Sequence, residues 1–552
     1  MAYERIAYDF CALYGEGVTA DAAEVKKLVR RLYFITLFTI TLMGFASLPG
    51  AAQSGRTFYI DSDSGSNSNA GTKASPWKTH PYMQTSGACS GTGKAPAYSH
   101  AAGDQFIFKG GVTWPSACFP FNITAGGSSA SLPDVYTVDQ TWFSGGSFAR
   151  PIFAGQNATM PYNSAVAGQA MVAITASNVT LGTSTIARAG FDIGGQNLGS
   201  YNASKCGSFV VAVGDGSNPS GVKNVIVSQS ILHDWITTSA AQNANYGHNA
   251  GGMCYASDGN ISAGANVALD HSEVRDDGNV VNGASMPFGA CGKSISIQYS
   301  TCHYLFEGIV GFLAVHDSEF GNLNYPNSAD SLNSSGAHVN TIEADVFNGD
   351  GPIYNNYIHD AKTYGEVIDA GCSSPIYNNV ISNVTNAAIR VDGSSCTSFV
   401  ANNTIDVTNG TNLGSQGVSC MQHDPGVSIQ GGNNICIVGG AANGGAGALG
   451  GSTNYVMSAN EASTYGFTSG NRYFPSSSNP NVVGKGTNLV STLSAASTSA
   501  VNYDTAGAPW FGRSPVARTS SWDLGAYVIN GQSSNQTGSK PNPPNSLSAI
   551  VQ

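Results

Sequence analysis

One nine-residue pattern recurs in the second half of the chain. It reads "PIYNNYIHD" from Pro352, "PIYNNVISN" from Pro375 and "FVANNTIDV" from Phe399. Its Asn-Asn pairs stand 23 and 24 residues apart, and a further pair at 433–434 follows 31 residues later. A unit this short cannot bury an apolar face alone, so the units must stack on one another.

Weaker copies of the pattern extend upstream. They read "NVIVSQSILHD" from Asn224, "NVALDHSEVRDD" from Asn266, "SISIQYSTCHY" from Ser294 and "LAVHDSEFGN" from Leu313. Apolar and polar residues alternate in each copy, and no segment has the period of a long helix. The sequence therefore predicts an all-β solenoid with coils ~4.8 Å apart. Stacked Asn side chains would bond to one another and to turn backbone, so we interpret the Asn-Asn pairs as structural.

The stretch from Arg56 to His80 predicts how the stack begins. Residues Thr57 to Ile60 are aromatic and β-branched, which favours a strand, and a run of Asp, Ser, Gly and Asn follows. We expect a first strand and a loop that folds back on it and protects its open edge. A calcium-binding loop is the alternative interpretation, because side chains with oxygen donors stand at alternate positions from Asp61 to Asn69. The bidentate Glu and the Gly of an EF-hand are missing, however.

Residues 1–52 are expected to be a leader and a secretory signal peptide. Basic residues between 26 and 31 precede an apolar run over 32–45, and small residues supply a cleavage site before Gln53. An apolar run of about fourteen residues is short for a membrane span, so an uncleaved anchor is the lesser alternative. The acidic residues within 1–24 do not fit a signal, and a later translation start, for example at Val25, would explain them.

We divide the remainder by the positions of these patterns. The predicted parts are an amino-terminal cap with the first coils (53–125), the β-helix (126–485), a carboxy-terminal cap (486–530) and a Pro- and Ser-rich tail (531–552). The mature chain would be secreted, extracellular or at the cell surface, with no membrane span.

The cysteines of such an exported chain favour disulfides over metal binding. Ten of the eleven follow the leader, and none forms a CxxC pair. Cys372 and Cys396 lie 24 residues apart at nearly the same phase of the repeat, which brings them within bridging range. We expect that bond, together with Cys89–Cys118 and Cys420–Cys436.

Composition restricts the partners. Hydrophobic residues make up 41% of the chain, enough for a long core, and only 10% are charged. The net charge of −11 argues against a nucleic-acid partner, because no basic cluster remains after the signal to neutralise phosphates. It also argues mildly against an acidic polysaccharide, unless a local basic groove overrides the total.

The repeat and two flanking motifs together resemble a known family. The flanking motifs are "AGDQFIFKGGVTW" from Ala102 and the closing "YDTAGAP…SSWDLGAY" between Tyr503 and Tyr527. With the opening stretch, they resemble the secreted bacterial right-handed parallel β-helix proteins of the pectin-lyase-like fold, over roughly residues 56–529. The resemblance implies a right-handed parallel β-helix with two caps, and a polysaccharide bound along an outward-facing sheet.

The resemblance leaves the activity open, because this fold hosts unrelated functions. It implies a polysaccharide lyase or a glycoside hydrolase. The alternative is a non-catalytic structural or adhesive β-helix.

The best candidate site spans two coils, "GEVIDAGC" ending at Cys372 and "AAIRVDGSSC" ending at Cys396. We align Asp369 with Asp392, so that strand alternation places both, with Arg390, on the outer face. Carboxylates on adjacent coils would be ~5 Å apart, as in a retaining glycosidase. Carboxylates separated by two coils would suit an inverting glycosidase.

Two other interpretations of these charges stay open. Glu366, Asp369 and Asp392 are candidate ligands for Ca²⁺ that would hold a uronate, with Arg390 as base or carboxylate clamp. No other cofactor is indicated. In the simplest interpretation the charges lie on a solvated face, where Arg390 neutralises its neighbours.

A second candidate site lies in the long excursion between Phe320 and Ile353. It contains His338 and Glu343, and long loops on a rigid solenoid often carry binding groups. His338 is a candidate general base near neutral pH. Packing within the turn is the alternative role.

Overall fold

The structure is a computed structural model, and it describes most of the chain after residue 54. The described residues are 55–197, 206–214, 221–235, 250–256, 265–276, 280–281, 284–285, 289–324, 340–344, 351–362, 365–384, 386–410, 417–439, 453–492, 498–518 and 522–529. The predicted leader and tail lie outside them. Within these ranges, no helix combines the length and hydrophobicity that a membrane span requires.

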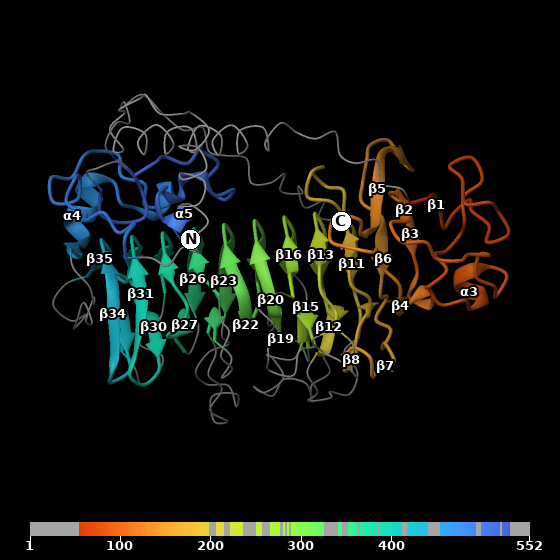
Figure 1. The fold of residues 1–552 in the computed structure, drawn as a ribbon, viewed down its shortest axis with the longest axis horizontal. Coiled ribbons are helices and arrows are strands. Elements are labelled where there is room, and N and C mark those ends of the chain that lie inside the picture. Colours follow the sequence, from red (N-terminus) through yellow and green to blue (C-terminus); the bar gives the residue numbers. More distant parts are fainter. Residues whose placement is uncertain are drawn as a thin grey trace, which may run out of the picture. The chain divides into compact units, whose positions relative to one another are not determined.

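Parallel strands form nearly all of the fold (Figure 1). β1 pairs in parallel with β2, and β2 with β5, and this pairing recurs from coil to coil as far as β36. The chain therefore makes one turn of a helix between paired strands. The predicted right-handed parallel β-helix is confirmed.

The strands belong to two long sheets. The larger contains β1 (Thr57–Ile60), β2 (Gln105–Gly110), β4 (Phe121–Ile123), β5 (Asp134–Phe143), β7 (Tyr162–Asn163), β8 (Gly168–Gln169), β9 (Val172–Ile174), β10 (Val179–Leu181), β12 (Gly207–Val213), β13 (Val225–Ser228), β15 (Ala250–Tyr255), β16 (Val267–Asp270), β20 (Ala290–Gln298), β22 (Glu307–His316), β24 (Ile342–Glu343), β25 (Ile353–Tyr354), β27 (Ile368–Gly371), β28 (Ile376–Tyr377), β30 (Ala387–Asp392), β31 (Cys396–Ala401), β33 (Ser419–His423) and β34 (Val427–Gly432).

The second sheet contains β3 (Thr113–Trp114), β6 (Ile152–Ala154), β11 (Asp192–Gly194), β14 (Ile231–His233), β17 (Glu273–Arg275), β21 (Thr301–His303), β23 (Glu319–Asn324), β26 (Tyr357–Lys362), β29 (Val380–Ser382), β32 (Thr404–Asp406), β35 (Ile435–Val438) and β36 (Tyr455–Ser458). A short hairpin, β18 (Val280–Val281) and β19 (Ala284–Ser285), is antiparallel. The helical segments are α3 (Gly87–Ser90), η1 (Ser116–Cys118), α4 (Ala459–Tyr465), η5 (Ser469–Asn471), α5 (Thr498–Val501) and η6 (Thr505–Gly507).

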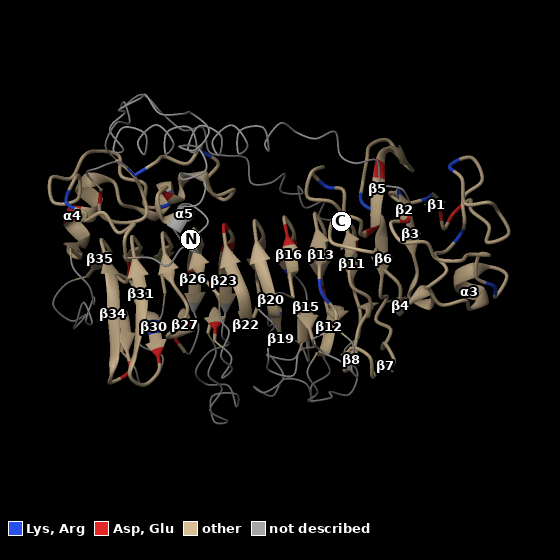
Figure 2. Ribbon diagram, in the orientation of Figure 1, with Lys and Arg blue, Asp and Glu red and all other residues tan. Residues whose placement is uncertain are grey.

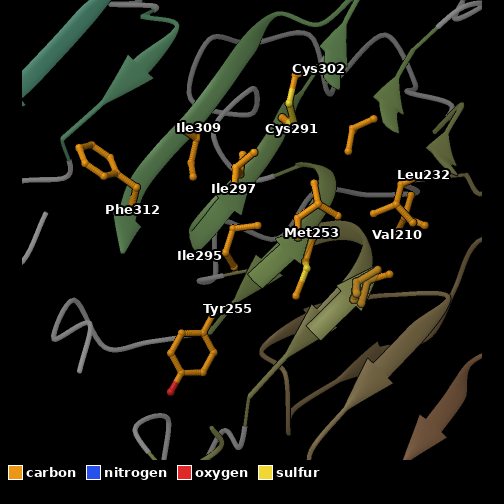
Figure 3. Close-up of a cluster of buried hydrophobic side chains, with 14 of the residues drawn as sticks. Val210, Leu232, Met253, Tyr255, Cys291, Ile295, Ile297, Cys302, Ile309 and Phe312 are labelled. Atoms are coloured by element: carbon orange, nitrogen blue, oxygen red, sulfur yellow. A yellow bond between two sulfur atoms is a disulfide. The ribbon is translucent and has the colours of Figure 1, made fainter. Parts of the chain in front are cut away.

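The core consists of apolar ladders that run from coil to coil. Ile309, Ile342, Ile368, Ile389 and Met421 occupy one register position on successive coils, and all five are fully buried. Figure 3 shows part of this interior around β12 to β22. Each such side chain contributes roughly 1.5–3 kcal/mol of transfer free energy, so the stack is stabilised only when neighbouring coils are present.

The Asn-Asn pairs form the predicted ladder. The side-chain oxygen of Asn379 accepts hydrogen bonds from the backbone N–H and side-chain amide of Asn356, at 3.1 and 3.0 Å. The same two bonds link Asn379 to Asn403, and Asn403 to Asn434, which are fully buried. The first Asn of each pair has a φ near +55 to +60°, a conformation that Asn tolerates. The pairs are structural, as predicted.

The weaker upstream copies also form coils, with serine in place of asparagine. The hydroxyl oxygens of Ser272, Ser300 and Ser318 each accept from the backbone N–H of the preceding coil at 3.1 Å. Ser318 then donates its backbone N–H to Asn356, which joins the two ladders at 3.1 Å. A small polar side chain at this turn therefore links successive coils throughout this half of the stack.

The amino-terminal stretch folds as expected. β1 covers the predicted residues, and Trp77 pairs with Tyr59 and Asp61 through backbone hydrogen bonds of 2.8 to 2.9 Å. Two of the side-chain oxygen donors of the loop, those of Asp61 and Asn67, bind the protein itself. Asp61 accepts from Lys109 at 2.7 Å, and Asn67 accepts from the backbone N–H groups of Lys78 and Thr79, so these groups stabilise the fold of the cap.

Five disulfides are present among the described residues. The predicted bonds Cys89–Cys118, Cys372–Cys396 and Cys420–Cys436 are present, with Cα–Cα distances of 4.9, 6.1 and 5.9 Å. Two more bonds, Cys206–Cys254 and Cys291–Cys302, were not predicted. All five Cα–Cα distances lie within the ordinary range for disulfides.

The described residues after β36 contact the stacked strands of earlier coils. Tyr473 donates to Asp406 at 2.6 Å, Trp510 donates to the carbonyl of Asn355 at 2.7 Å, and the backbone of Ala526 donates to Thr404 at 3.0 Å. Tyr357 stacks on Trp510 at 5.2 Å. This carboxy-terminal segment therefore covers β26 and β32 of the second sheet.

Candidate active site

Four consecutive strands position the predicted site residues on the outer face of the larger sheet. Glu343, Asp369, Arg390 and Gln422 occupy one register position on β24, β27, β30 and β33. Their chain neighbours Ile342, Ile368, Ile389 and Met421 are fully buried, so alternation turns the polar column outward.

The predicted alignment of the two coils was wrong by two residues. Asp369 pairs with Arg390, and it is Gly371 that pairs with Asp392. The number of residues from one coil to the next is not constant. Ile368 pairs with a residue 21 positions later, whereas Ile376 pairs with one 24 positions later. A shift of the register by two residues leaves every side chain on the same face of the sheet. The predicted outward placement of Asp369, Arg390 and Asp392 is therefore correct.

Arg390 is the centre of the cluster. Its Nη1 lies 3.2 Å from Glu366, its Nε 2.6 Å from Asp392 and its Nη2 3.2 Å from Asp424. Burial of the guanidinium lowers its pKa, but Asp392 and Glu366 outweigh this effect and raise the pKa of Arg390 above its usual value. Arg390 therefore stays charged and holds three carboxylates around one planar group.

Asp392 is the carboxyl with the most unusual environment. Burial raises its pKa, Arg390 lowers it, and the charges of Asp424 and Glu366 raise it again, with a raised pKa as the result. Asp392 also hydrogen bonds to Asp369, which is buried and accepts from Asn340 at 3.3 Å. The side chain of Asp392 is nevertheless 41% exposed, so a carboxyl with a raised pKa is accessible on the outer face.

The two predicted sites partly merge. Glu343, assigned to the long excursion, lies on β24 directly beside Asp369 in the register. The structure therefore joins Glu343 to the two-coil cluster. His338, the other candidate of the excursion, lies outside the described residues.

The calcium ligands do not fit a metal site. Arg390 contacts two of the three candidates, Glu366 and Asp392, and Asn340 donates to the third, Asp369. Over the part of the chain that the structure describes, no group of three or more His, Cys, Asp or Glu side chains has the arrangement of a metal site. The cation at the centre of this cluster is the guanidinium itself.

Asp424 and Asn340 belong to the site and were not predicted. Asp424 follows β33 in "MQHDPG", on the coil after Arg390, and its side chain is 36% exposed. A charged residue directly after a strand on the adjacent coil is a usable signal. The irregular coil length hid it, because Asn402 and Asn433 stand 31 residues apart there.

Comparisons with known proteins concern the chain path alone. No family profile and no curated protein matches the sequence. The similar solved structures include a rhamnogalacturonan lyase, 14% identical over 72% of this chain and 87% of that chain, with a TM-score of 0.38. The pectate lyase Pel9A is 12% identical over 86% and 96%, with a TM-score of 0.38. The GH136 lacto-N-biosidase from Eubacterium ramulus is 10% identical over 73% and 68%, with a TM-score of 0.28. Values this low carry no argument about activity.

Proposed function

We propose that the protein is a secreted β-helix enzyme that binds extracellular polysaccharide and hydrolyses its glycosidic bonds at the Arg390 cluster. The observation that carries the proposal is the Asp392 carboxyl, which is accessible, has a raised pKa and stands beside other carboxylates. A general acid must hold its proton near the working pH, and neighbouring negative charge achieves this. The five disulfides support secretion, because such bonds persist in oxidising compartments.

Each residue of the cluster has a role in this proposal. Asp392 donates its proton to the oxygen of the leaving sugar. Asp424, which contacts Nη2 of the same guanidinium, supplies the second carboxylate that assists the attack of water at the anomeric carbon. A retaining glycosidase needs its two carboxyl groups ~5–5.5 Å apart, and an inverting one needs them about 6.5–9.5 Å apart. Arg390 and Asp369 position Asp392 and set its protonation.

A non-catalytic structural or adhesive role is the second candidate. The observation that favours it is that three carboxylates are paired with Arg390, which neutralises part of the face without any substrate. Glycan binding without turnover would then be the whole function.

The test is cleavage of a panel of neutral, amino-sugar and acidic polysaccharides by the purified mature protein. New reducing ends without an unsaturated product indicate hydrolysis, and an unsaturated product would indicate elimination and contradict the proposed reaction. Asp392→Asn should lower turnover by at least about a hundredfold. Its melting temperature should change little, because the side chain is partly exposed.

Asp63→Asn is a matched control, since Asp63 is exposed in the amino-terminal loop, far along the chain from the cluster. Its turnover should equal that of the unaltered protein. If Asp392→Asn retains full activity while His338→Ala abolishes it, the chemistry lies in the long excursion and the proposed site is wrong. Absence of turnover on every polymer would favour the structural role.

A further inference from the structure

We infer that the glycan bound at the Arg390 cluster carries no carboxylate on the sugars that occupy it, and is a neutral or amino-sugar polymer. This inference rests on the proposed function and names its substrate class. It concerns binding preference, which is measurable whether or not the bound glycan is cleaved.

The first observation is the distribution of basic residues. Between residues 301 and 450 the chain contains thirteen Asp and Glu residues but only two basic ones, Lys362 and Arg390. This count includes every residue of the sequence between these two positions. Lys362 ends β26, which belongs to the other sheet. Acidic residues outnumber basic ones along β22 to β34 in Figure 2. Within residues 301–450 the sequence therefore contains no cluster of basic residues that offsets the acidic total.

The second observation is that Arg390 is already engaged. Nε, Nη1 and Nη2 each contact a different carboxylate of the protein, from Asp392, Glu366 and Asp424. Proteins recognise a substrate carboxylate chiefly through an arginine that offers two parallel N–H donors. A uronate could reach such an edge of Arg390 only by displacing Asp392 or Asp424.

The third observation is the position of the nearest other cation along the column. Lys293 occupies the same register position as Val310, which precedes Glu343, Asp369 and Arg390 in successive coils. At ~4.8 Å per coil, Lys293 stands roughly 19 Å from Arg390. A uronate placed at Asp392 would therefore face carboxylates at short range and Lys293 only at long range.

Like charges about 5 Å apart repel strongly enough in a partly buried site to weaken binding by at least tenfold. A neutral pyranose has no such cost, and its hydroxyls donate to carboxylates. An ammonium group on an amino sugar is attracted by the same carboxylates. The acidic face therefore disfavours the binding of uronates and is compatible with neutral sugars and with amino sugars.

The test compares polymers that differ only in the carboxylate. A set of polyuronates and their carboxyl-reduced counterparts, with chitosan and N-acetylated chitosan, is assayed for binding by affinity electrophoresis at low salt. We expect at least one reduced or amino-sugar polymer to bind, at least tenfold more tightly than any polyuronate. Chitosan against its N-acetylated form then separates the amino-sugar class from the neutral class.

Variants connect the preference to the site. Replacement of Glu343 by Gln together with Asp424 by Asn should reduce the discrimination against polyuronates several-fold, whereas Asp63→Asn should leave it unchanged. Tighter binding of a polyuronate than of its reduced counterpart would overturn the inference. Binding with the expected preference but without cleavage would overturn only the proposed hydrolysis. Binding to no polymer would overturn both.

Discussion

The asparagine ladder makes a quantitative prediction about stability through Asn403. Its side-chain oxygen accepts from the backbone N–H and side-chain amide of Asn379 at 2.9 and 3.0 Å. Its amide donates to Asn434 at 2.9 Å and to the carbonyl of Ile376 at 3.1 Å. Asn403→Ala removes all four bonds in a fully buried place, where water cannot replace them.

The magnitude follows from these contacts. A buried hydrogen bond contributes about 1 kcal/mol net, and a buried group left unpaired costs about 1–3 kcal/mol. Four lost bonds therefore lower the free energy of unfolding by roughly 4 kcal/mol, close to the upper end for single substitutions. With an m-value of ~3 kcal/mol/M, the urea midpoint should fall by about 1 M.

The assay is urea unfolding of the disulfide-intact protein, with hydrogen exchange as a local readout. The backbone amide of Asn379 donates to Asn403, so its protection should fall more than that of amides in distant coils. Asn460→Ala is the matched control, because Asn460 is exposed on α4, and its effect should stay within about 0.5 kcal/mol. A midpoint for Asn403→Ala equal to that of the control would refute the stabilising role of the ladder.

Two further predictions concern pH and cross-links. Burial lowers the pKa of His233, but its contacts with Asp192 at 2.7 Å and Asp234 at 2.8 Å outweigh burial and raise the pKa to about 9. The folded-state pKa exceeds the unfolded value of ~6.5, so this stabilisation is complete below pH ~6.5 and is lost as the pH rises through about 9. His233→Gln should therefore flatten the fall of the unfolding midpoint between pH 7 and 10, and an unchanged pH profile would count against the pairing. Replacing both cysteines of Cys206–Cys254 by Ser should destabilise the protein more than the same change in Cys291–Cys302, by about 1 kcal/mol, since the closed loops span 48 and 11 residues. The reverse order in urea unfolding would show that loop closure does not govern these bonds.

The sequence by itself determined the fold and the side of the strands on which each residue lies. Alternation is a local property with a period of two, so Ile389 could be placed inside and Arg390 outside without knowledge of any neighbour. The structural role of the Asn-Asn pairs could likewise be predicted from the sequence, because polar side chains need hydrogen-bond partners wherever they are buried. Cys372–Cys396 followed from the same local phase.

Only the tertiary structure decided which residues meet between coils. The register depends on how many residues each turn holds, and the coils at Asp369 and Arg390 are 21 residues apart where the Asn-Asn pairs are 24 apart. That difference placed Asp369 beside Arg390. The lengths of other coils brought in Glu343 and Asp424 and placed Cys206 within bonding distance of Cys254. Turn length is not periodic, so a repeat predicts the stacking of coils but leaves the contacts across them to the folded chain.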